Sequence, residues 1–316
     1  MNKKLATTII LSGSSIAAMH VINRVHTSVC TAKNLLNNSE NRYYEWRFGK
    51  MRYQKKGGGS PLLLIHDLTV GSSNYEYHRL INNLTENHEI YSIDLLGYGL
   101  SDKPSMTYTS GLYEQLISDF ILNIIKRKTS VVVSGESVPF VIMACHNNPD
   151  IFNKIICINP LSLYLQNQIP SQQTKLMKFF LEIPILGTFT YHVLTNRVTL
   201  DKLFQNQYFH QPDEIRDKYI SNYLEAAYDG GYNSKFAFAS YVGKYMGMNI
   251  LHELKEINNS ILMIGGEREE DIHTTIENYR YYNPAIEEVY IPNTKHLPQL
   301  EAPDEMLEQI KIFLCS

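Results

Sequence analysis

The stretch VVVSGESVPF, residues 131–140, decides how the rest of the chain is interpreted. A run of β-branched residues stops at Ser134 and Gly135, and Ser137 follows two residues later. A buried strand that ends in Gly-x-Ser and leads into a helix is typical of the tight turn that raises a nucleophilic hydroxyl above a parallel sheet. Pro139 stands where this motif has its second glycine, and a proline in the first helical turn loses no hydrogen bond. The stretch therefore predicts Ser137 as a nucleophile, with a helix-capping serine as the alternative.

The composition is that of a globular chain with a large core. Its 316 residues are 44% hydrophobic and 19% charged. A net charge of -3 gives no indication of nucleic-acid binding. The four cysteines have no C-x-x-C spacing, so we expect neither a disulfide framework nor a zinc cluster. We also expect no organic cofactor or metal, because the chain has no phosphate loop, no dinucleotide fingerprint and no ligand-spaced histidine pair.

Strand and helix patterns alternate through the first half of the chain. Short apolar runs predict strands over residues 46–54, 61–66, 89–94, 131–133, 154–159, 260–266 and 287–292. Helical periodicity lies over residues 75–84, 113–125, 138–145 and 301–314. Such alternation predicts an α/β fold built on a mostly parallel, doubly wound sheet.

The alternation of strands and helices stops after the strand expected over residues 154–159. Residues 161–250 contain no convincing strand and read as aromatic-rich helices. We therefore expect an α/β core over residues 43–160 and 251–316, with a helical cap over residues 161–250. Ligands of such sheets bind beyond the carboxyl ends of the strands, where an insertion of this kind can cover them.

The N-terminus differs from the rest of the chain. Residues 1–42 are interpreted as an apolar leader followed by a polar linker. Residues 5–22 carry no formal charge, and this length is the lower limit for crossing a bilayer. We predict a membrane anchor, and therefore localisation at the cell membrane. A cleaved signal peptide, which would make the protein secreted, and a packing helix are the alternatives. Basic residues flank both ends, so the orientation is left open.

A histidine and an acidic loop follow the last two expected strands. His296 lies late in the chain, after the last strand, as the order Ser…acid…His requires. Its imidazole can take the proton of Ser137 and return it to a leaving group. One carboxylate of the acidic loop should orient His296, and the residues alone leave four candidates open: Glu267, Glu269, Glu270 and Asp271.

Two backbone regions can stabilise an oxyanion. The start of the helix after Ser137 offers unpaired N–H groups. The loop His66-Asp67-Leu68, which follows another buried strand, can supply a second N–H donor.

Three segments resemble a known family. YSIDLLGYGLSDKP, residues 91–104, is similar to the D-x-x-G-x-G-x-S-x-x-P segment of capped α/β-hydrolases of the epoxide-hydrolase and esterase-like branch. PLLLIHDL, residues 61–68, resembles that family's strand followed by His-Gly, and IPNTKHLPQLEAPDE, residues 291–305, resembles its histidine loop. The similarity extends in order over residues 46–314.

The resemblance implies roles for single residues. Ser137 matches the nucleophile and His296 the base. Glu269 fits the family's acid position, because it precedes His296 by 27 residues (296 − 269), and Asp271 is the second choice. The oxyanion donors would be the N–H groups of Leu68 and Val138.

The chain also departs from the family pattern at three glycines. Asp67, Lys295 and Pro139 each occupy a glycine position of the family motifs. An anion at Asp67 would oppose catalysis if it pointed into the oxyanion site. An outward position, capping the following helix, is the commoner role of Asp in such a loop.

A serine nucleophile implies acyl-enzyme chemistry. We expect an enzyme that hydrolyses a carboxylic ester, thioester or lactone, and a small-molecule ester with an apolar acyl group as its substrate. Acyl transfer and carbon–carbon bond hydrolysis use the same triad and stay open. A binding protein with an impaired hydrolase site is the alternative from another class.

Overall fold

The computed structural model describes residues 3–315, and the side chains of residues 14–315. Its centre is an eight-stranded sheet in the order β1-β2-β4-β3-β5-β6-β7-β8. The strands are β1 Asn41–Trp46, β2 Gly49–Gly57, β3 Ser60–Ile65, β4 His88–Ile93, β5 Thr129–Ser134, β6 Phe152–Ile158, β7 Ile261–Gly266 and β8 Glu287–Ile291. The first two strands are antiparallel to their neighbours, and the pairs formed among β3 to β8 are all parallel. The predicted α/β fold, with its mostly parallel sheet, is confirmed.

Helices cover both faces of the sheet. They are α2 Ile81–Leu84, α3 Ser110–Phe120, α4 Val138–Asn147, α11 Leu251–Glu256, α12 Ile272–Tyr282, α13 Pro298–Glu301 and α14 Pro303–Cys315. In β3, Leu63 and Ile65 pack with α3, α4, α11 and α12, whereas Leu62 and Leu64 pack with α2 and α14. Successive side chains of a strand point to opposite faces, so a strand buried on both sides reads as a continuous apolar run.

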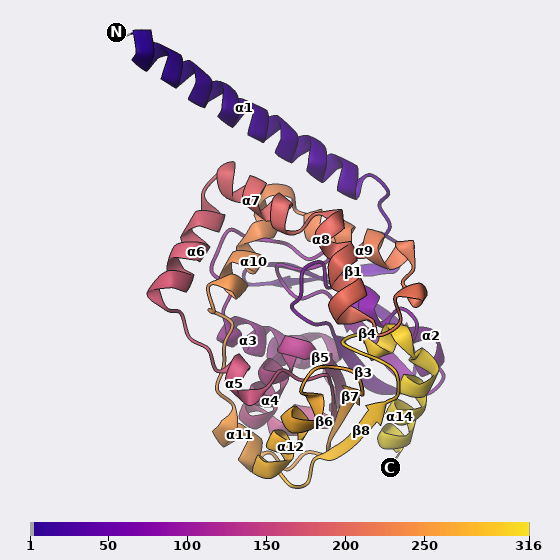
Figure 1. The fold of residues 1–316 in the computed structure, drawn as a ribbon. Helices are drawn as coiled ribbons and strands as arrows, with labels where there is room; N and C mark the ends of the chain where they lie inside the picture. Colours follow the sequence, from indigo (N-terminus) through magenta and orange to yellow (C-terminus); the bar gives the residue numbers. More distant parts are fainter. Residues whose placement is uncertain (1–2, 316) are drawn as a thin grey trace.

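A helical layer lies beyond the carboxyl ends of the parallel strands (Figure 1). It contains α5 Leu163–Gln166, α6 Gln172–Glu182, α7 Leu186–Leu194, α8 Arg197–Leu203, α9 Asp217–Tyr228 and α10 Lys235–Val242. We call these helices, with their connections, the helical insertion. Its own apolar core is aromatic and also takes up Leu297 and Leu300 of the loop after β8.

The N-terminal segment forms one long helix, α1 Lys3–Thr31, which extends away from the helical insertion (Figure 1). Its C-terminal part packs on α7 and α9. Asn23 donates a hydrogen bond to the Ile185 carbonyl, and the His26 ring lies against those of His192 and Tyr228. Among the residues that the structure describes, no helix is long and apolar enough to cross a membrane. The predicted membrane anchor over residues 5–22, and the localisation built on it, are therefore wrong; polar residues dilute the apolar run.

One strand begins at the end of the segment predicted as a linker, two residues before the expected start of the core. β1 begins at Asn41 and pairs along its whole length with β2, from Asn41 opposite Gln54 to Trp46 opposite Gly49. Its burial pattern is mostly exposed, as an edge strand's is, so its sequence shows little apolar alternation. Pairing with β2, rather than a hydrophobic pattern, fixes this strand.

Candidate active site

The turn after β5 has its left-handed residue at Gly135. This glycine has φ +55°, a conformation that suits glycine, whereas Ser137 has φ -80° and immediately precedes α4. The strained point between strand and helix therefore lies two residues before the predicted nucleophile. Pro139 lies in the first turn of α4, where it removes no helical hydrogen bond.

Ser137 is buried and faces the protein interior. Its Oγ donates a hydrogen bond of 2.7 Å to the His66 carbonyl oxygen. The side chain is fully buried, with 0% of its surface exposed. The structure therefore does not bring the Ser137 hydroxyl to the His296 ring, because both ring nitrogens of His296 have other partners.

His296 lies between two carboxylates. Its Nδ1 is 3.2 Å from Glu269 Oε1, and its Nε2 is 2.9 Å from Asp67 Oδ2. The Tyr208 ring of the helical insertion stacks on the imidazole at a centroid distance of 5.3 Å. The structure thus brings His296 and Glu269 together, while Asp271 lies at the start of α12 in a left-handed conformation. Asp67 occupies the position where a nucleophile would meet the base.

The Asp67 carboxylate also fills the oxyanion position. Its Oδ1 accepts hydrogen bonds of 2.7 Å from the N–H groups of Leu68 and Glu136. Leu68 was predicted as one of these donors. The other predicted donor, Val138, is not in the pair, because its N–H group donates to the Gly135 carbonyl in the turn. The Glu136 N–H group takes this place instead, in the 3-10 turn Gly135–Ser137 that connects β5 to α4.

Asp67 and Gly135 fit one another sterically. A Cβ atom added at Gly135 would overlap the Asp67 carboxyl group. Any side chain at the strained point of the turn would therefore compete with Asp67 for the same space. The expectation that Asp67 points outward and caps the next helix is wrong. The side chain is fully buried, and Ser73 caps that helical turn instead.

His66 holds the Asp67 loop in place. Its Nε2 accepts a hydrogen bond from the Leu95 N–H group, so the ring proton is on Nδ1 and is donated to the Asp67 carbonyl. Burial, opposed by the carboxylate of Asp94, lowers the pKa of His66 and keeps the ring neutral. The loop backbone is thereby fixed at the end of β3.

The site is rich in carboxyl groups. Burial and the charge of Asp67 raise the pKa of both Glu76 and Glu136 to about 7. Glu76 accepts hydrogen bonds from the Asp67 N–H and the Ser134 hydroxyl, and Glu136 accepts one from the Tyr241 hydroxyl. Burial lowers the pKa of His296, but hydrogen bonds with Asp67 and Glu269 outweigh it and raise that pKa well above the usual value. The resting site therefore holds an imidazolium between two carboxylates.

Lys295, the third departure from the family pattern, has no steric consequence at the site. Its φ is negative, so this position does not require glycine. Its N–H group donates to Glu301, and its exposed side chain donates to the Asn206 carbonyl. Both contacts fix the histidine loop against neighbouring elements.

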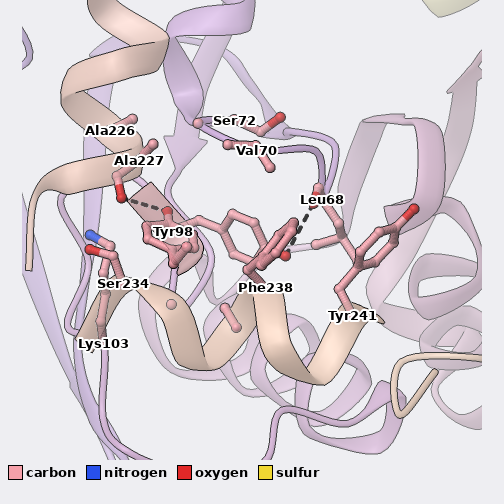
Figure 2. A pocket seen from close by; sticks show the side chains of 14 residues that line it. Leu68, Val70, Ser72, Tyr98, Lys103, Ala226, Ala227, Ser234, Phe238 and Tyr241 are labelled. Atoms are coloured by element: carbon pink, nitrogen blue, oxygen red, sulfur yellow. Dashed lines mark hydrogen bonds between the residues drawn. The ribbon is translucent and has the colours of Figure 1, made fainter. Parts of the chain in front are cut away.

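Two small cavities end at the Asp67 loop. One of about 40 Å³ is lined by Leu68, Tyr98, Phe238 and Tyr241 among others, and Figure 2 shows these side chains around it. A second, of about 130 Å³, is bordered by Leu68, Tyr241 and Glu136. Leu68 and Glu136 are the residues whose N–H groups hold Asp67. Both cavities thus end at Leu68, the residue that follows Asp67, and Asp67 itself lines neither of them.

Comparison with known proteins identifies the family. The model of the alpha/beta hydrolase family matches residues 62–309. The chain is 31% identical, over 96 residues, to 2-hydroxy-6-oxo-6-(2'-aminophenyl)hexa-2,4-dienoic acid hydrolase of Metapseudomonas resinovorans. That match covers 28% of this chain and 33% of the relative, so it spans about a third of that protein. Identity to 2-(acetamidomethylene)succinate hydrolase of Mesorhizobium japonicum is 20% and covers 84% of this chain and 91% of that protein.

A solved structure supports the same fold. The epoxide hydrolase CorEH superposes with a TM-score of 0.70 at 16% identity, covering 87% of this chain and 98% of that one. The family match extends over most of the chain and includes both the Asp67 loop and the His296 loop. The chain therefore belongs to the alpha/beta hydrolase family and is an enzyme of the hydrolase class.

Proposed function

We propose that the protein hydrolyses a small molecule at an electrophilic saturated carbon, such as that of an epoxide or a haloalkane, with Asp67 as the nucleophile. The observation that carries this proposal is the position of the Asp67 carboxylate. Oδ1 lies between the N–H groups of Leu68 and Glu136, and Oδ2 faces His296. Oδ2 is the atom that would attack.

The first step forms an ester on the protein. Asp67 Oδ2 forms a bond to the substrate carbon, and the bond from that carbon to the halide or the epoxide oxygen breaks. A halide leaves as an anion, whereas an epoxide oxygen stays attached to the substrate and takes up a proton from a water molecule. Esterification removes the charge of Asp67, which is a major cause of the raised pKa of His296. The imidazolium can then lose its proton to the solvent.

The second step releases the product. Neutral His296, oriented by Glu269, takes a proton from water, and the resulting hydroxide attacks Asp67 Cγ. The negative charge that develops on Oδ1 is stabilised by the N–H groups of Leu68 and Glu136, which already point at that atom. The bond between Asp67 Cγ and the ester oxygen that carries the substrate breaks. The alcohol leaves with one proton, and Asp67 is ionised again.

The carboxylate position disfavours an ester substrate. In ester hydrolysis the substrate's carbonyl oxygen needs the oxyanion donors, and here Asp67 Oδ1 already occupies them. In displacement at a saturated carbon no substrate oxygen needs that place. Of the two small cavities beside Leu68, the first has a mostly apolar lining and the second a lining that is about half polar, and both are in keeping with a small substrate.

The covalent intermediate provides the test. We expect the variant His296→Gln to react with a reactive terminal epoxide or 1-haloalkane and to stop at the ester, because no base activates water. Peptide mass spectrometry should then find the added mass on the peptide that contains Asp67. Ser137→Ala/His296→Gln should label equally. A label on Ser137, or labelling that persists in Asp67→Asn/His296→Gln, would contradict the proposal.

Ester hydrolysis through Ser137 is the second candidate. The contact of His296 with Glu269, and the position of Ser137 immediately before α4, favour it. It requires Ser137 Oγ to leave the His66 carbonyl and Asp67 to leave the oxyanion donors. A fluorophosphonate probe that labels Ser137, together with p-nitrophenyl ester turnover that Ser137→Ala abolishes and Asp67→Asn preserves, would establish this candidate in place of the first.

A further inference from the structure

Two helices of the α/β core bring together a set of metal-ligating side chains outside the active site. His146 lies in the last turn of α4, and His252 and Glu256 lie one turn apart on α11. One ligand atom of each lies within 4.8 Å of the others. None of these residues takes part in the site around Asp67.

The separations are those of ligands around a shared ion. His146 Nδ1 is 3.7 Å from Glu256 Oε2, and His252 Nε2 is 3.5 Å from Glu256 Oε1. Both distances are too long for a good hydrogen bond. With zinc–nitrogen and zinc–oxygen distances of about 2.0–2.2 Å, two ligands of one tetrahedral ion are about 3.4 Å apart. The donors therefore need only small side-chain movements to close on one cation.

The local charge also favours a cation. The carboxyl end of α4 presents the negative end of its helix dipole at His146. The neighbouring cation on α11, Lys255, points away, because its Nζ lies over the Tyr282 ring at 5.1 Å. The Leu254 side chain is fully buried in the main core, which fixes α11 against α4.

We propose that His146, His252 and Glu256 bind a divalent transition metal, with Zn²⁺ as the ion that two imidazoles and one carboxylate suit best. The remaining coordination position is open to water. The ion would tie α11, where the chain returns from the helical insertion, to the carboxyl end of the helix that follows the Gly135 turn. Its role would be structural, independent of the reaction proposed above.

Zinc binding to the full chain without a polyhistidine tag tests the proposal. We expect isothermal titration calorimetry at pH 7.5 to show one saturable site for Zn²⁺, with a Tm that rises with zinc concentration. Co²⁺ should give visible d–d absorption bands. The His252 side chain is exposed, and the variant His252→Ala should lose both the zinc binding and the Co²⁺ absorption. Glu256→Gln should weaken binding by about tenfold or more.

The controls separate this site from other ligands. Glu253→Gln removes the same charge from the same helix, and His273→Ala removes a histidine elsewhere; both should bind zinc as the wild type does. His296→Gln should also bind normally, which excludes the active-site histidine. Absence of saturable binding in the wild type, or unchanged binding in His252→Ala and Glu256→Gln, would overturn the proposal. At pH 5.5 binding should weaken, because imidazoles must be neutral to ligate.

Discussion

The loops after β3 and β5 differ from the family pattern in opposite ways. The family motif has glycine in the loop after β3 and a nucleophile at the strained turn after β5. Here the loop after β3 has Asp67, and the turn after β5 has Gly135 at its left-handed position. The Asp67 carboxyl group occupies the space that a side chain at position 135 would need. A side chain from the loop after β3 can thus occupy the place that a side chain from the turn after β5 would have, provided that this turn has a glycine there.

The largest effect is expected from Asp67→Asn. If Asp67 is the nucleophile, turnover of epoxide or haloalkane substrates falls by roughly 10³-fold or more. The same change removes a carboxylate that raises the pKa of His296. NMR titration should therefore find a lower pKa for the His296 ring in the variant. An unchanged His296 titration would show that the two side chains do not interact in solution. It would thereby contradict the position of the Asp67 carboxylate on which the comparison of the two loops rests.

Gly135→Ser tests the steric exchange directly. A serine at this left-handed position overlaps Asp67, so we expect a loss of about 3 kcal/mol in the free energy of unfolding. Denaturant unfolding measures this loss. The double variant Asp67→Gly/Gly135→Ser should recover much of the stability, and a fluorophosphonate should label Ser at position 135. Additive losses in the double variant would mean that the two positions are independent.

The pH dependence of stability sharpens the comparison. The pKa of His296 is raised in the folded state, so its contribution is complete below the unfolded value of about 6.5 and is lost as pH rises through the folded value. The contribution of Glu76 and Glu136 to stability is also lost as pH rises, between about pH 4.5 and 7. Their raised pKa values mean that ionisation is disfavoured in the folded state. The difference between wild type and His296→Gln isolates the histidine. A difference that stays constant from pH 6 to pH 10 would contradict the ion-paired state.

The smallest effect is expected from Ser137→Ala. The change removes one buried hydrogen bond to the His66 carbonyl, worth about 1 kcal/mol of stability. Turnover of an epoxide or haloalkane should stay within about twofold of the wild type, because the hydroxyl is bound to the His66 carbonyl and not to His296. Thermal unfolding and steady-state kinetics measure the two quantities. A complete loss of turnover with an unchanged Tm would identify Ser137, rather than Asp67, as the nucleophile.

The sequence by itself determined the fold and half of the candidate site. Short continuous apolar runs such as residues 61–66 are typical of strands buried on both faces, and their alternation with helices predicts the parallel sheet. The positions after consecutive strands predicted that a carboxylate of the acidic loop contacts His296, because the carboxyl ends of parallel strands meet at one edge. That this carboxylate is Glu269 was implied only by the family resemblance.

Only the tertiary structure decided which residue stands opposite His296. The place where a strand ends depends on its pairing: β5 is held by β3, where Ile65 pairs with Val133, and by β6 as far as Ser134. This pairing places the left-handed residue of the turn at Gly135, two residues before Ser137. A three-residue motif cannot encode this register, because the hydrogen bonds that fix it come from distant strands. The direction of the Asp67 side chain has the same origin, since it depends on N–H groups from two separate loops.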